Sequence, residues 1–204
     1  MGLSVTSPAF SPGGEIPALF TCEGRDLSPA LDWTGVPEAA KSLVLIVDDP
    51  DAPDPKAPKM TWVHWVLYNL PPTTRGLPEA VAPKDLPART KEGTNDWKRT
   101  GYGGPCPPIG RHRYFHKLYA LDTLLPDLGP ATKPQVEAAM KGHVIAQAEL
   151  LPALASITLL AAETDFSEPG EMGVLIDESQ VAMLEDLMAE RGFLTGRQMA
   201  GSFQ

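Results

Sequence analysis

The chain has few of the features that mark several large classes of protein. None of its apolar runs approaches the roughly 20 residues needed to cross a membrane, so we do not expect an integral membrane protein. Its two cysteines, Cys22 and Cys106, are too few for a disulfide framework. Acidic residues outnumber basic ones by 26 to 17, and without a basic surface we expect no binding to nucleic acid.

The N-terminus and the cysteines favour a cytoplasmic location. The first residues lack the basic and apolar segments of a secretory signal. Two thiols are most simply explained by a reducing cytosol, although one bridge between them stays open. Cys106 precedes two prolines rather than a helix N-terminus that would activate its thiol. We interpret it as a small, buried residue packed in a loop, not as a nucleophile.

The charges divide the chain into two parts. Residues 151–204 contain nine acids and two bases, whereas residues 1–150 contain 17 acids and 15 bases. We therefore predict a main domain over residues 1–150 and an acidic C-terminal extension over residues 151–204. An apolar stripe at helical spacing predicts a helix over residues 178–191 of the extension, with Gly192 as its stop.

The main domain reads as all-β. Its many prolines separate short apolar runs, a pattern typical of a β-sandwich rather than an α/β sheet. Strong strands are expected at Ser42–Val47, Trp62–Asn69 and Arg113–Leu121, and weaker ones at Leu3–Thr6, Ala18–Thr21 and Ala30–Trp33. Alternation would place Trp62, His64, Val66 and Tyr68 on one face, and His112, Tyr114, His116 and Leu118 on another.

One helix is expected in the main domain. Thr132–Gln135 has the form of a capping box, with Pro134 in the first turn. Apolar residues recur at helical spacing from Val136 onward. The prediction is a helix that ends near Leu150, before Pro152.

The segment Gly101–Tyr114 is the least ordinary part of the chain. Its glycines permit close backbone approach and its prolines fix the backbone, so it forms a rigid loop. That loop is either a connector between strands or the wall of a preformed pocket. Asp48–Pro53 predicts a stiff turn with three carboxylates, either simply solvated or part of a site. The four histidines lack zinc-ligand spacing, and Asp48–Pro53 is no calcium loop, so we predict no metal and no cofactor.

These groups together suit a small oxyanion. Histidine N–H groups, a tyrosine hydroxyl and loop amides are donors for phosphate or carboxylate. The aspartates could orient a histidine or receive a cationic group of the ligand. If histidine charge contributes, affinity should fall as pH rises through the ordinary histidine titration near about 6.5.

Three segments, Asp49–Pro53, Trp62–His64 and Gly104–Tyr114, resemble the signature segments of the phosphatidylethanolamine-binding protein family. Ser28–Trp33 and Phe115–Asp122 resemble its flanking strands, and the Gly-Pro-Cys-Pro-Pro form is similar to the prokaryotic, bacterial branch called Raf-kinase-inhibitor-like. The similarity covers about residues 1–150.

The resemblance implies a Greek-key β-sandwich of two antiparallel sheets with a few peripheral helices. It also implies an anion pocket built from Asp49, His64, Gly104, Pro107, Pro108, His112 and Tyr114, supported by Asp51 and Trp62. A cis proline is implied at Pro53. Val63 stands where eukaryotic relatives have a second histidine, so that contribution is missing.

The leading hypothesis is a binding protein for phosphate or a phosphorylated head group that modulates a kinase or protease partner. The alternative is a hydrolase that acts on phosphoesters or peptides through the same pocket, but the chain shows no convincing activated nucleophile. A protein–protein module acting through the extension, and a homodimer, are further alternatives.

Overall fold

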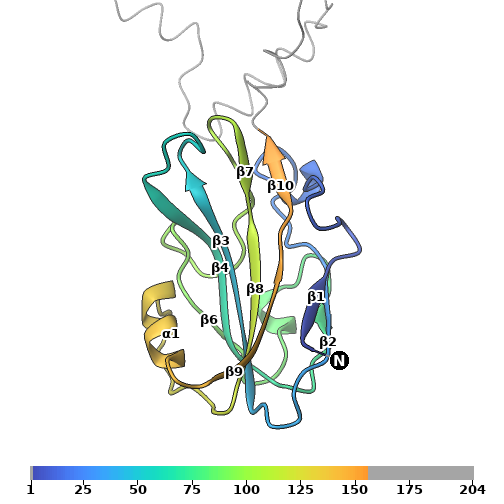
Figure 1. The fold of residues 1–204 in the computed structure, drawn as a ribbon, viewed down its shortest axis with the longest axis vertical. Coiled ribbons are helices and arrows are strands. Elements are labelled where there is room, and N and C mark those ends of the chain that lie inside the picture. The colour runs from blue at the N-terminus through green and yellow to red at the C-terminus, as the bar shows by residue number, and fades with distance from the viewer. Residues whose placement is uncertain (1, 156–204) are drawn as a thin grey trace, which may run out of the picture. The chain divides into compact units, whose positions relative to one another are not determined.

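The computed structural model describes residues 2–155. Ten strands and three short helices follow one another along this part of the chain (Figure 1). The strands are β1 (Ser4–Thr6), β2 (Leu31–Thr34), β3 (Ser42–Ala52), β4 (Met60–Leu70), β5 (Gly76–Leu77), β6 (Lys91–Glu92), β7 (Arg111–Arg113), β8 (Phe115–Leu121), β9 (Val144–Leu150) and β10 (Ala153–Ala155). The α-helix is α1 (Lys133–Met140), and two 3-10 helices are η1 (Ala18–Phe20) and η2 (Pro83–Asp85).

Antiparallel pairing arranges the strands in three sheets. The largest has the order β6-β4-β3-β8-β9, and a smaller one has the order β1-β2-β5. β7 and β10 form a separate two-stranded ribbon. A long connection separates β4 from β8, yet both flank β3, so the strand with the most apolar run lies in the middle of the large sheet.

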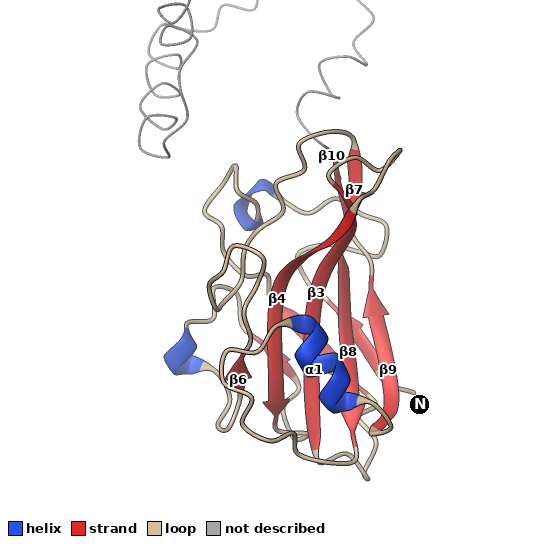
Figure 2. Ribbon diagram, turned by 90° about the vertical axis from the view of Figure 1, so that its left-hand side faces the viewer, coloured by secondary structure: helices blue, strands red, loops and turns tan. Residues whose placement is uncertain are grey.

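A hydrophobic core fills the space between the two main sheets. The smaller sheet contributes Leu31 and Trp33, and the larger contributes Leu45 and Leu67, all buried. Helix α1 covers part of the other face of the large sheet (Figure 2), where Val136 and Met140 pack on Val44 and Ile46. The expected all-β fold with a few peripheral helices is confirmed.

The helix predicted to end near Leu150 is wrong beyond Met140. The capping box between Thr132 and Gln135 starts the helix as expected. Gly142, at a φ of 85 degrees in the left-handed region, then ends it, because glycine adopts this conformation without a Cβ penalty. The following residues form β9, whose inward side chains Ala146, Ala148 and Leu150 alternate with outward ones.

Other boundaries also differ from the sequence-based expectations. Ala18–Phe20 is a 3-10 helix rather than a strand. The predicted helix at 178–191, and all of the extension beyond Ala155, lie outside the described residues. Within residues 2–155, no helix is long and apolar enough to cross a membrane.

The predicted acidic turn at Asp48–Pro53 is instead the end of β3, with only Pro53 beyond it. Asp48 is completely buried, and Lys117 of β8 and Lys133 of α1 donate to its carboxylate at 2.6 to 2.9 Å. A buried charge is tolerated when it is paired and hydrogen-bonded. This cluster therefore ties the helix and β8 to the central strand.

We predict that Asp48→Asn lowers the free energy of unfolding by about 3 kcal/mol, because two partly buried lysines lose their counter-charge. Urea unfolding would measure the loss. Asp127→Asn removes the exposed pair with Lys91 and is the control, expected to leave the urea midpoint nearly unchanged. Equal midpoints for the two variants would contradict a stabilising role for the buried cluster.

Candidate functional site

A pocket of about 290 Å³ opens at the end of the sandwich where the β3–β4 hairpin meets β7. Such a volume suits a small ligand. Two of its walls, the end of β3 and the start of β4, are neighbours in sequence, and the third, the loop that leads into β7, lies far along the chain. The lining residues are Asp49, Ala52, Pro53, Lys59, Met60, Trp62, His64, Cys106, Pro107, Pro108 and His112.

The structure thus brings six of the nine predicted site residues to one cavity. They are Asp49, Trp62, His64, Pro107, Pro108 and His112. The other three, Asp51, Gly104 and Tyr114, do not line it, and each holds a neighbouring part of the site in place. The peptide bond between Ala52 and Pro53 is cis, as the family resemblance implied.

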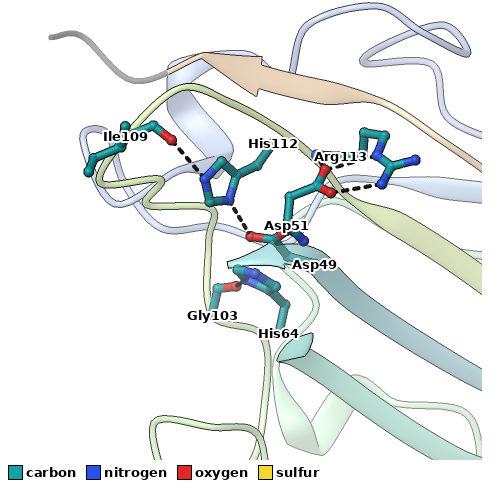
Figure 3. A network of polar contacts seen from close by, with 7 residues as sticks. All are labelled: Asp49, Asp51, His64, Gly103, Ile109, His112 and Arg113. Carbon is teal, nitrogen blue, oxygen red and sulfur yellow. Dashed lines mark hydrogen bonds and ion pairs between the residues drawn. The ribbon is translucent and has the colours of Figure 1, made fainter. Parts of the chain in front are cut away.

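Asp49 and His112 form a buried pair in the pocket wall (Figure 3). His112 Nδ1 lies 2.7 Å from Asp49 Oδ2, and Nε2 lies 2.9 Å from the carbonyl oxygen of Ile109. Both partners are acceptors, so both contacts are satisfied only when each ring nitrogen carries a proton. His112 therefore has no ring nitrogen left to offer to a ligand.

Asp51 anchors the strand that carries His112. The Arg113 guanidinium donates to both carboxylate oxygens of Asp51, at 2.9 and 2.7 Å, and the Arg113 amide donates at 3.0 Å. These contacts lower the pKa of Asp51 below its ordinary value, against the effect of burial. The backbone N–H of Asp51 donates to Asp49 Oδ1 at 2.7 Å. The two aspartates are thus linked to each other, and both bind residues of β7 and hold that strand in place.

A β-bulge sets the position of His64. β3 pairs Val47 with Trp65 and Asp48 with Val63, so His64 is an extra residue on β4. The predicted common face of Trp62, His64, Val66 and Tyr68 is therefore wrong: Val66 and Tyr68 pack under α1, whereas His64 lies on the pocket side.

The His64 ring is buried with one nitrogen paired and one unpaired. Nδ1 lies 2.7 Å from the carbonyl oxygen of Gly103 (Figure 3). Nε2 is buried and has no hydrogen-bond partner among the described residues. Burial lowers the pKa of His64, opposed by the Gly103 contact and by Asp49.

Tyr114 packs against His64 rather than lining the cavity. The two rings meet edge to face with centroids 5.2 Å apart, and the buried Tyr114 hydroxyl also lacks a partner. Burial raises the pKa of this phenol, so it stays protonated. The predicted common face of His112, Tyr114, His116 and Leu118 is confirmed, since all four are buried and alternate with more exposed residues.

Gly104 fixes the rigid loop to the body of the domain. Its amide donates to Asp26 Oδ1 at 2.5 Å, and a Cβ at this position would lie 2.6 Å from the Phe20 carbonyl oxygen. Tyr102 donates from its hydroxyl to the same carbonyl at 2.9 Å. Only glycine permits this close approach, so the loop is held before any ligand binds.

The two cysteines form a disulfide bridge, Cys22–Cys106. The interpretation of Cys106 as a buried thiol is therefore wrong: the residue is exposed at the pocket wall and joined to the segment that supports the loop. Spacing alone could not reveal this pairing, because 84 positions separate the two residues. The bridge also removes the argument that linked two thiols to a reducing cytosol.

Sequence reasoning missed the residues at the mouth of the pocket. Lys59 and Met60 are exposed; Lys59 ends the connection from β3 and Met60 is the first residue of β4. Recognising Ser42–Asn69 as one long hairpin would have placed them beside Pro53. Among residues 2–155, no group of three or more His, Cys, Asp or Glu side chains is arranged to hold a metal ion.

Comparisons with known proteins show the family to which the chain belongs. The model of the family described as phosphatidylethanolamine-binding protein matches residues 6–153. A UPF0098 protein of Methanothermobacter thermautotrophicus is 50% identical over 151 residues, which cover 73% of this chain and 96% of the relative. The chain belongs to the phosphatidylethanolamine-binding protein family.

Solved structures show the same fold. A phosphatidylethanolamine-binding protein homolog of Chlamydia trachomatis is 43% identical with a TM-score of 0.68, covering 74% of this chain and 96% of its own. YbcL of Escherichia coli, described as a member of the mammalian family, is 34% identical with a TM-score of 0.68, covering 76% and 98%. Membership of this family supports ligand binding as the general role.

We predict that reducing the Cys22–Cys106 bridge lowers stability by up to about 4 kcal/mol, because the bridge closes a long loop in the unfolded chain. Urea unfolding with and without dithiothreitol would measure the difference. The Cys22→Ser/Cys106→Ser double variant should match the reduced protein and should not respond to the reductant. An unchanged midpoint on reduction would show that the bridge adds no stability.

Proposed function

We propose that this protein binds a small anion, a phosphate or a phosphorylated head group attached to an apolar portion. The observation that carries the proposal is the composition of the pocket. Its inner wall contains His64 with a buried, unpartnered nitrogen, and its mouth contains the exposed Lys59. A buried polar group without a hydrogen-bond partner costs free energy, so a ligand that supplies the missing partner binds favourably.

The remaining walls suit the rest of such a ligand. Ala52, Pro53, Met60, Pro107 and Pro108 are apolar, and the bridge and the prolines keep them in place. Preorganised walls reduce the entropy lost on binding. Modulation of a kinase or protease would then occur through a partner that contacts this mouth, where Met60 and Ile109 are more than half exposed.

Phenyl phosphate combines both parts and is the probe of choice. We predict that wild-type protein binds it at pH 6 and that His64→Leu weakens binding by tenfold or more, because a ligand hydrogen bond is lost. Isothermal titration calorimetry would measure both affinities. His143→Leu is the matched control, since His143 is half-exposed, pairs with Asp122 and does not line the pocket. Equal losses for both variants would argue against this pocket.

The geometry disfavours the hydrolase alternative. Both nitrogens of His112 are engaged by Asp49 and Ile109, and Cys106 is held in a disulfide. His112 therefore has no free nitrogen to act as a base, and the pocket offers no thiol nucleophile that the free nitrogen of His64 could activate.

We predict no turnover of p-nitrophenyl phosphate, or of generic peptides, above the buffer rate. Release of p-nitrophenol over hours would measure the former, and a fluorogenic peptide mixture the latter. Turnover by the wild-type protein that is lost in a correctly folded His112→Ala variant would contradict this prediction and support the hydrolase alternative.

A further inference from the structure

The contact between His64 and Gly103 decides where the proton of the neutral ring lies. A backbone carbonyl oxygen only accepts hydrogen bonds, so Nδ1, 2.7 Å away, must donate. A neutral imidazole carries one N–H, so the buried Nε2 then holds a lone pair. The neutral pocket wall thus presents a hydrogen-bond acceptor where an anion would need a donor.

The surroundings keep the ring neutral. Burial is the largest influence on the His64 pKa and lowers it. The hydrogen bond with Gly103 opposes this effect most, followed by the carboxylates of Asp49 and Asp48 on β3 and of Asp26 before β2, but the pKa stays below its ordinary value. Each is already paired: Asp48 with two lysines, Asp49 with His112 and Asp26 with Arg99.

From β8 and the residue before it, the ring faces two groups without negative charge. Tyr114 stays protonated, and burial lowers the pKa of His116 to about 4, so that ring is neutral. Lys59, at the mouth, is the charged group of the β3–β4 connection that lines the pocket. None of these neighbours supplies a proton to Nε2 near neutral pH.

The other donors of the pocket leave the lone pair of His64 Nε2 unsatisfied. Trp62 Nε1, which has no partner among residues 2–155, and Lys59 line the pocket and can donate to an anion, whereas His112 has both nitrogens engaged and the Tyr114 side chain lies outside the lining. An anion oxygen next to an unprotonated Nε2 would be repelled, because both atoms carry lone pairs and neither can donate a hydrogen bond. A proton placed between the two atoms turns that repulsion into a charge-assisted hydrogen bond.

Resting on the proposed function, we propose that this pocket binds its anion together with one proton, shared between His64 Nε2 and a ligand oxygen. The ligand class that fits best is the phosphomonoester, whose second acidic proton has a pKa near about 6 and which can therefore bring the proton itself. Phosphodiesters and sulfate esters carry no such proton, so they bind only when His64 takes one from solvent.

A matched pair of ligands tests the proposal. Phenyl phosphate and phenyl sulfate have the same aryl group and tetrahedral head, but phenyl sulfate does not titrate between pH 5.5 and 8. Any pH dependence of its binding therefore belongs to the protein. We expect its affinity to fall about tenfold from pH 7 to pH 8, which is the slope for uptake of one proton. Between pH 5.5 and 6.5, phenyl phosphate should lose less affinity than phenyl sulfate.

Calorimetry counts the proton directly. A proton taken up on binding at pH 8 is released by the buffer, so the measured enthalpy includes the ionisation enthalpy of that buffer. The binding enthalpies in Tris and HEPES should therefore differ by the difference between the two ionisation enthalpies, multiplied by about one proton per ligand. His64→Gln should abolish this uptake and flatten the phenyl sulfate profile, while His143→Gln should retain both. Circular dichroism would verify that each variant is folded.

Nitrogen NMR of the histidine rings provides a test that needs no folded variant. The free protein at pH 7.5 should show His64 protonated on Nδ1 alone. A proton on Nε2 instead, binding without proton uptake, or uptake retained in His64→Gln would each overturn the proton-sharing proposal and leave anion binding intact. If neither ester binds between pH 5.5 and 8, the proposed function falls as well.

Discussion

The burial of three carboxylates at the end of β3 is the constraint on which the rest of the structure depends. Asp48, Asp49 and Asp51 are nearly or fully buried, and a buried charge is stable only when it is paired. Their partners come from α1, β8 and β7, so satisfying the charges brings these elements together. Consecutive residues face opposite sides of a strand, and the cluster therefore anchors the helix on one side and the pocket on the other.

The pocket combines these paired carboxylates with a loop that is held rigid by close backbone packing and by a disulfide bridge. Gly104 permits contact with Asp26 and Phe20, and the Cys22–Cys106 bridge fastens the same loop to the same segment. A bulge in β4 then turns His64 toward the cavity that the loop encloses. Both nitrogens of His112 are engaged by protein acceptors, so His64 is the pocket histidine with a nitrogen available for a hydrogen bond to a ligand.

Short sequence patterns predicted a helix or strand correctly where a single short-range interaction determines its structure. The apolar run at Ser42–Val47 and the capping box at Thr132 were read correctly because hydrophobic burial and helix capping act over a few residues. The prediction of a helix through Leu150 was wrong because apolar residues of an edge strand happened to recur at helical spacing. Pairing with β8 overrode that pattern, and Gly142 was the local stop that could have revealed it.

The sequence by itself determined the all-β class and the rigid loop, since composition and alternation express burial directly, while the resemblance to a known family implied six of the residues that line the pocket. Only the tertiary structure decided which polar groups meet: that His112 is engaged on both nitrogens, that Lys59 stands at the mouth, and that the cysteines are joined. Hydrogen bonds and ion pairs are short-ranged, so partners many residues apart are identified only when the packed core brings them within reach.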